Sequence, residues 1–348
     1  MTPAVSVLLP VCNAVPYVEA AVRSILTQTF RDFELLLIDD GSTDGSGPIL
    51  ERLAAEDGRI RLLRRENRGL IATLNQGLAL ARAPYTARMD ADDISLPQRL
   101  AAQHAHMEAH PEVAALGGAI RLTNADGRPG RRVGYPSRPA IGEALLWGSP
   151  LAHPAVMLRT DAVRRAGGYP ADFPHAEDYA LWLRLCREGA LDNLPQVLLL
   201  YRVHGRSVSH RNALLQRAST LRAQAFFLAA QQPDPALLGI EDNGDFLDAL
   251  GLPDGERMRL LARMLALCPH LAGDAQTDAE GARWLRLLAP HAREPEIRRA
   301  LAVYHLRAAR FPGMGKGRRL LHAMQALFCD AAACLRHLAG KFRGARRP

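Results

Sequence analysis

Short, largely apolar runs alternate with segments of helical periodicity between residues 5 and 89, and this alternation constrains the fold more than any other feature. It predicts strands at 5–9, 33–38, 59–65 and 85–89, with helices between them at 15–28, 47–56 and 69–81. Strands joined by helical crossovers pair in parallel, because a parallel connection must return across the face of the sheet. The sequence therefore predicts an α/β fold with a doubly wound, mostly parallel sheet.

The pattern changes after about residue 210, where helical segments separated by proline and glycine turns replace the strands. An apolar content of 48% is sufficient for a sizeable core in a chain of 348 residues. We expect two parts: an α/β domain over residues 1–210, followed by a helical C-terminal region over residues 211–348.

The ends of the predicted strands carry polar residues, and open parallel sheets bind ligands at the carboxyl ends of their strands. The first strand ends in "PVCN", the second in "DDGSTDGS" and the fourth in "MDADD". None of these turns contains GxGxxG or GxxxxGK[ST], which disfavours a dinucleotide fold and a P-loop enzyme. Acidic side chains, rather than glycine-cradled phosphates, occupy the expected binding edge.

Three carboxylates crowd together at Asp90, Asp92 and Asp93. Hard divalent cations such as Mg²⁺ or Mn²⁺ prefer carboxylate oxygens, and such an ion neutralises a diphosphate. The alternative is that Asp92 or Asp93 caps the helix that follows. The residues alone leave both interpretations open.

A second acidic pair, Asp39 and Asp40, ends the second strand, and the flexible turn after it allows a flat ligand to approach. A carboxylate there is suited to accept a hydrogen bond from a nucleobase. The alternative is a turn with Ser42 or Asp44 as a helix cap.

An amphipathic helix is predicted in "AEDYALWLRLCREG", where apolar residues anchor Asp178 in the first turn beside a cleft. A carboxylate in that place is suited to take a proton from an attacking hydroxyl. Alternatively, Glu177 and Asp178 only complement the helix dipole.

These motifs, taken in chain order, resemble those of family 2 inverting glycosyltransferases with the GT-A fold. The resemblance rests on residues 5–46, on "NRGLIATLNQGLALARAPYTARMDADDISLPQRL" and on "HAEDYALWLRL", and it covers roughly residues 4–210. It implies a nucleotide-diphosphate sugar donor, usually a uridine nucleotide, a bound Mn²⁺ or Mg²⁺, and an aspartate base.

The resemblance also implies roles for individual residues. Nucleotide binding falls on Pro10, Cys12, Asn13, Asp39, Asp40, Asn67, Arg68, Gly69, Asp90 and Ala91. The metal falls on Asp90, Asp92 and His204, the general base on Asp178, and the acceptor side on Glu177, His153 and Trp147. The chain departs from the family at Cys12, where tyrosine is common, so base stacking is not expected from this residue.

The expected activity is transfer of a single sugar to a hydroxyl of a glycan or lipid-linked acceptor in the synthesis of a surface polysaccharide or glycoconjugate. Processive members carry QxxRW and membrane helices, and this chain has neither. One alternative is a sugar nucleotidyltransferase, which would require a glycine-rich loop with Arg and Lys after the first strand. Another is a non-catalytic carbohydrate- or nucleotide-binding protein on the same fold.

Basic residues gather at the C-terminal end. Residues 301–348 hold ten of the 44 Lys and Arg residues and one of the 36 Asp and Glu residues. The rest of the chain is therefore near neutral, which disfavours nucleic-acid binding. Residues 316–348 combine an apolar helical stripe with this charge, which fits a helix on an anionic membrane or an ordinary packing helix.

Cysteine usage and the N-terminal sequence bear on localisation. The five cysteines are scattered, and "MTPAVSVLLPVCN" lacks the features of a signal peptide. We expect a cytoplasmic protein, with peripheral attachment at the inner face of the membrane as an additional expectation.

Overall fold

The computed structural model describes residues 2–145, 148–204, 213–228, 249–267 and 288–308, together with residues 233, 246, 285, 286, 324 and 325. The chain divides into two compact units, residues 1–224 and 225–348.

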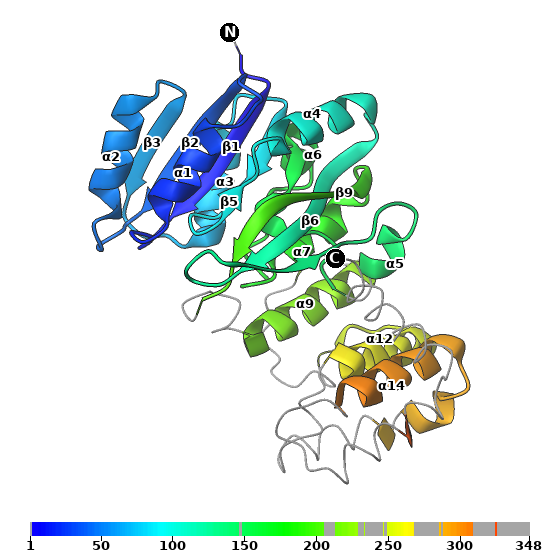
Figure 1. Ribbon diagram of the computed structural model, residues 1–348. Coiled ribbons are helices and arrows are strands. Elements are labelled where there is room, and N and C mark those ends of the chain that lie inside the picture. Colours follow the sequence, from blue (N-terminus) through cyan, green and yellow to red (C-terminus); the bar gives the residue numbers. More distant parts are fainter. Residues whose placement is uncertain are drawn as a thin grey trace. The chain divides into compact units, whose positions relative to one another are not determined.

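The first unit contains a mixed sheet (Figure 1). Its strands are β1 (Val5–Val11), β2 (Phe33–Asp40), β3 (Ile60–Arg65), β4 (Tyr85–Arg88), β5 (Ile94–Ser95), β6 (Val113–Thr123), β7 (Pro129–Val133), β8 (Met157–Arg159) and β9 (Ala190–Arg202). The strand order is β3-β2-β1-β4-β8-β6-β9-β5, and β7 pairs with β6. Strands β3, β2, β1 and β4 are mutually parallel, as the sequence predicts, whereas β8 pairs antiparallel with both β4 and β6.

Helices cover both faces of the parallel half of the sheet. The described helices that lie wholly in the first unit are α1 (Val18–Leu26), α2 (Ser46–Glu56), α3 (Leu70–Leu80), α4 (Arg99–Ala109), α5 (Ile141–Leu145), α6 (Thr160–Arg165), α7 (Glu177–Leu185) and the short η1 (His153–Ala155). The buried face of α1 packs with alternate residues of β1 and β2, such as Val7 and Leu37, whereas α3 lies on the opposite face (Figure 1). At Gly77 of α3 a Cβ atom would lie 2.1 Å from Leu8, so glycine permits the close approach of this helix to β1.

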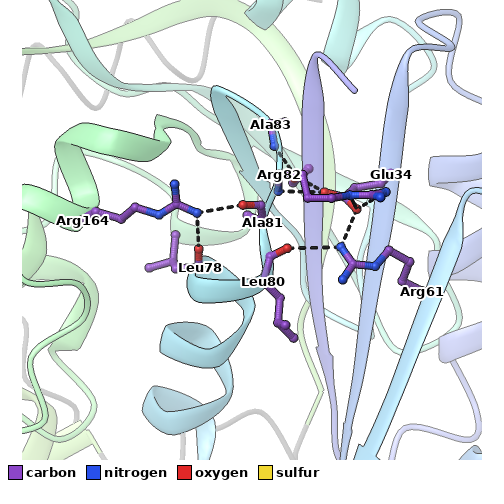
Figure 2. Close-up of polar contacts among 9 residues, drawn as sticks. Glu34, Arg61, Leu78, Leu80, Ala81, Arg82, Ala83 and Arg164 are labelled. Carbon is purple, nitrogen blue, oxygen red and sulfur yellow. Dashed lines mark hydrogen bonds and ion pairs between the residues drawn. The ribbon is translucent and has the colours of Figure 1, made fainter. Parts of the chain in front are cut away.

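The start of β2 is fixed by a buried carboxylate, Glu34 (Figure 2). It accepts hydrogen bonds from Ser6 of β1 (2.6 Å), from Arg61 of β3 (2.7 Å) and from the backbone and side chain of Arg82 before β4. Beside it, Arg164 of α6 donates to two carbonyl oxygens at the end of α3, those of Leu78 and Ala81. These contacts link the parallel strands at their amino ends. The register of the strands is therefore set at the end of the sheet opposite the binding site.

The second unit contains two described helices of 14 residues each, α12 (Asp254–Leu267) and α14 (Pro295–Ala308), which pack against each other, and the short η3 (Ala289–His291). The helix α9 (Ala213–Leu228) contains the division between the units, whereas a boundary near residue 210 was expected. Apart from Met324 and Gln325, residues 316–348 lie outside the described part, as does Trp147. The membrane-binding or packing role of this segment and the acceptor-side role of Trp147 therefore remain predictions. Among the described residues, no helix is both long and apolar enough to span a bilayer.

Candidate active site

Asp90, Asp92 and Asp93 form a tight turn directly after β4, and one carboxylate oxygen from each lies within 4.8 Å of the others. The α4 helix that follows begins after Gln98 and receives no side-chain cap, so neither Asp92 nor Asp93 acts as its N-cap. Burial and the charges of Asp90 and Asp92 raise the pKa of Asp93 well above its ordinary value. A cation bound between these carboxylates would offset their mutual repulsion.

The end of β9 holds this turn in place. Arg202 donates from its backbone to the Asp93 carboxylate (2.8 Å) and from its side chain to the Asp92 carbonyl (2.8 Å). Two residues later, the His204 ring nitrogen Nε2 lies 2.9 Å from Asp92 Oδ2. The His204 ring also stacks on Tyr17, with ring centroids 5.2 Å apart. The predicted metal residues Asp90, Asp92 and His204 therefore meet in space although 112 positions separate Asp92 from His204.

The donor set fits a hard divalent cation. Carboxylate oxygens with a neighbouring imidazole suit Mg²⁺ or Mn²⁺. One buried oxygen, Oδ2 of Asp93, has no hydrogen-bond partner among the described residues. Such an orphaned acceptor beside two further carboxylates is the pattern that a cation would complete.

A cavity of about 770 Å³ lies on one side of the Asp turn. Its wall includes ten of the predicted residues: Pro10, Cys12, Asn13, Asp40, Asn67, Gly69, Asp90, Ala91, Asp92 and His204. Asp39 and Arg68 do not line it. The volume and the position at the carboxyl ends of β1, β2 and β4 suit a nucleotide.

The Asp40 carboxylate at this cavity is buried and already hydrogen-bonded. It accepts from the side chain of Arg65 (2.9 Å) and from the backbone N–H groups of Arg68 (3.0 Å) and Gly69 (2.8 Å). Asp39 points elsewhere and accepts from the Ser42 backbone (3.0 Å) and from Arg64 (3.2 Å). Asp40 thus fixes the loop before α3, and any contact with a ligand is additional to that role.

The turn after β2 also shapes the cavity wall. Asp44 accepts from the backbone of Val15 (3.0 Å) and from both the backbone and the hydroxyl of Ser46, at the start of α2. Asn13 has a φ of 53° and accepts from the backbone of Thr43 (2.8 Å). The loops after β1 and β2 are therefore joined by hydrogen bonds to side chains rather than by a ladder of backbone hydrogen bonds.

A second cavity, of about 460 Å³, also has Asp90 and Asp92 of the Asp turn in its wall. Asp178 and Glu177, in the first turn of α7, line it together with His153. Burial, with a smaller effect of the Glu177 charge, raises the pKa of Asp178 to about 7. The backbone N–H of Tyr179 donates to Asp178 Oδ1 (2.7 Å), which opposes that rise. A carboxylate with a pKa near 7 is suited to general-base chemistry.

His153 at this cavity is buried and hydrogen-bonded. Its Nε2 lies 2.9 Å from the Tyr169 hydroxyl, and burial together with Arg88 lowers the His153 pKa well below its ordinary value. His153 lines the same cavity as Asp178, and its expected place on the acceptor side stays a prediction.

The two cavities meet at shared wall residues, Leu70, Asp90 and Asp92. A molecule that occupies both would pass over the Asp turn, with one end among the loops after β1 and β2 and the other near Asp178.

The cavity walls also include residues that were not predicted from the sequence, among them Tyr17, Arg88, Tyr135 and His175. Arg88 is 3% exposed and contacts Asp90. His175, just before α7, has a φ of 63°, which is strained for a non-glycine residue. The sequence shows a charged residue at the end of β4, directly before the acidic turn, but not that its side chain is buried.

A mixed, mostly parallel sheet with an Asp-X-Asp turn between two joined cavities is the arrangement of a GT-A glycosyltransferase. A family model described as glycosyl transferase family 2 matches residues 6–164. The chain is 34% identical over 207 residues to the O-antigen biosynthesis glycosyltransferase WbnJ of Escherichia coli, and the match covers 58% of this chain and 81% of that protein. The chain therefore belongs to glycosyl transferase family 2 and is a glycosyltransferase.

Two solved structures share the fold. S. aureus TarS 1–349 in complex with UDP-GlcNAc has a TM-score of 0.58 at 16% identity, covering 97% of this chain and 92% of that chain. The mannosyltransferase PcManGT from Pyrobaculum calidifontis, in complex with GDP-Man and Mn²⁺, has a TM-score of 0.52 at 20% identity, covering 97% and 88%. The predicted GT-A fold is thereby confirmed.

Proposed function

We propose that this protein is an inverting glycosyltransferase that moves one sugar from a nucleotide-diphosphate sugar to a hydroxyl of a glycan or lipid-linked acceptor. The observation that carries the proposal is the meeting of the two cavities at Asp90 and Asp92, with Asp178 in the second one. The nucleotide occupies the larger cavity, and the acceptor hydroxyl reaches the transferred sugar from the smaller one.

Asp178 acts as the base in this scheme. It takes the proton of the acceptor hydroxyl while the hydroxyl oxygen forms a bond to the anomeric carbon of the donor. The bond from that carbon to the diphosphate breaks, and its electron pair leaves with the diphosphate. Attack from the side opposite the leaving group inverts the configuration, and a single base without a nucleophile is sufficient for it.

The pKa of Asp178 supports this role. At a pKa of about 7, the carboxylate is a stronger base than an exposed aspartate and is about half ionised at neutral pH. Burial raises the pKa of the neighbouring Glu177. The charge of Glu177 in turn contributes to the raised pKa of Asp178.

Asp90 and Asp92, with His204 beside them, are the residues that would hold Mn²⁺ or Mg²⁺, and such an ion would neutralise the negative charge of the departing diphosphate. A nucleotide-sugar donor is supported by the UDP-GlcNAc and GDP-Man found in the two structures of the same fold. A role in polysaccharide assembly is supported by the similarity to an O-antigen biosynthesis enzyme.

A screen of nucleotide sugars tests this function. UDP-glucose, UDP-galactose, UDP-GlcNAc and GDP-mannose are incubated with the protein and Mn²⁺, and release of the nucleotide diphosphate is measured. We expect release from at least one donor, its loss in excess chelator, and its loss in Asp92→Ala. Full activity in chelator would overturn the metal role, and no release or binding with any donor would overturn the proposed function.

A further inference from the structure

The Arg88 guanidinium is buried at the second cavity with part of its hydrogen-bonding capacity unused. Its Nη2 lies 2.5 Å from Asp90 Oδ1, but Nε and Nη1 have no hydrogen-bond partner among the described residues. The side chain is 4% exposed. Buried N–H groups without acceptors cost free energy, so their persistence in a folded protein calls for an explanation.

Hydrogen bonds from neighbouring segments hold the backbone of Arg88. Its carbonyl oxygen accepts from Arg99 Nη2 (2.6 Å), which also donates to the Val156 carbonyl (3.1 Å). The Arg88 backbone N–H donates to that same Val156 carbonyl (3.0 Å). The Arg88 backbone is therefore held at the end of β4, and the guanidinium that extends from it pairs with Asp90.

The charges around Arg88 indicate which kind of ligand it meets. Burial raises the pKa of Asp90, Asp93, Glu177 and Asp178, and the nearby Arg88 charge partly opposes that rise in all four. With several acids nearby, an anionic ligand group would be repelled on balance, whereas a neutral hydroxyl oxygen can accept from a guanidinium without that penalty.

We propose that Arg88 binds hydroxyl oxygens of the transferred sugar and helps to set which sugar the enzyme accepts. This inference rests on the proposed function, because it places the sugar between Asp90 and Asp178, and Arg88 lines the same cavity as these two residues. Arg88 then serves two partners at once: Nη2 orients Asp90, and the remaining N–H groups meet the sugar.

Binding measurements separate the sugar from the nucleotide. The background is Asp178→Asn, which keeps the donor from being consumed. The probes are the nucleotide sugar that the unmodified enzyme hydrolyses and the nucleotide diphosphate of that same donor, UDP or GDP, each with Mn²⁺. If Arg88 binds the sugar, Arg88→Gln weakens binding of the nucleotide sugar about 10- to 100-fold, the range for hydrogen bonds to a charged group. Binding of the free nucleotide diphosphate should change by less than about threefold, a difference under 1 kcal/mol.

Equal weakening of both probes would show that Arg88 only orients Asp90 and would overturn the assignment. Unchanged binding of both probes would overturn it as well. Failure of the unmodified chain to bind any nucleotide diphosphate with Mn²⁺ would overturn the proposed function and this assignment together, so the two failures are distinguishable.

A second test does not depend on the folding of Arg88→Gln. Donors that lack one sugar hydroxyl at a time are compared in the unmodified chain and in Arg88→Lys, which keeps the positive charge. One deoxy donor should bind at least about tenfold more weakly to the unmodified chain, and that penalty should largely disappear in Arg88→Lys, as expected for two groups in contact. Identical deoxy penalties in both proteins would overturn the assignment.

Discussion

At the scale of single residues, Asp178 carries the chemistry, and its environment predicts a specific pH dependence. Because the pKa of Asp178 is raised to about 7, the base is progressively protonated below that pH. We expect kcat/KM to fall about tenfold per pH unit on the acid side of about pH 7. A pH–rate profile with saturating metal checks this, and a profile that is flat between pH 5 and pH 8 would contradict it.

The Asp178→Asn variant keeps the size of the side chain but cannot accept the proton. Turnover should fall by roughly 10²- to 10⁴-fold, the usual contribution of a general base, with donor affinity nearly unchanged. The matched control is Glu177→Gln, which retains Asp178 but removes one charge that raises its pKa, so the acid limb should move to lower pH. If Asp178→Asn instead loses donor affinity and keeps its turnover, Asp178 is a binding residue.

At the scale of elements, the buried Glu34 network predicts how the sheet depends on pH. Its hydrogen bonds to Ser6, Arg61 and Arg82 outweigh the opposing effect of burial and lower the pKa of Glu34 from 4.5 to about 2. A depressed pKa contributes stability that is present above about pH 4.5 and is lost as the pH falls towards about 2. At about 1.4 kcal/mol per pKa unit, that contribution is about 3 kcal/mol.

Glu34→Gln should therefore lower the free energy of unfolding at pH 7 by about 3 kcal/mol, and by less at pH 3. The matched control is Glu56→Gln, since Glu56 pairs with Arg23 and Arg52 on the surface, where ion pairs contribute under about 1 kcal/mol. Urea titrations of the three proteins at both pH values provide the comparison. Equal losses for the two variants would mean that burial of Glu34 contributes nothing.

The parallel half of the sheet was predictable because β1 and β2 are short, largely apolar runs that only a doubly covered sheet can bury. The antiparallel half was less accessible. The two-residue strand Ile94–Ser95 exists through pairing with Leu199 and Leu200, more than a hundred positions away, and nothing local marks it.

The candidate site divides in the same way. Asp90, Asp92 and Asp178 stand out in the sequence, since acids at a strand end or helix start are visible locally. The environment of Arg88 is assembled from Val156, Arg99 and Glu177, which reach it from three other segments. A local pattern cannot reveal a buried arginine with unused N–H groups.

At the scale of the whole molecule, the basic C-terminal segment predicts an interaction with membranes. Each Lys or Arg near an anionic surface contributes about 1 kcal/mol, so several together give reversible, salt-sensitive binding. We expect the protein to sediment with anionic liposomes and to be released by salt. Removal of residues 316–348, or replacement of Lys341, Arg343, Arg346 and Arg347 by Gln, should weaken sedimentation while activity on a short soluble acceptor persists. Equal sedimentation of the original and altered proteins would exclude this segment as the anchor.

The stereochemistry of the product is the most direct test of the proposed inverting transfer. One experiment reports on the base, the direction of attack and the number of sugars transferred. With the donor identified by the nucleotide-sugar screen and a soluble acceptor, the new linkage is examined by NMR. We expect one added sugar whose anomeric configuration is opposite to that of the donor. A product that retains the donor configuration would contradict direct attack assisted by Asp178.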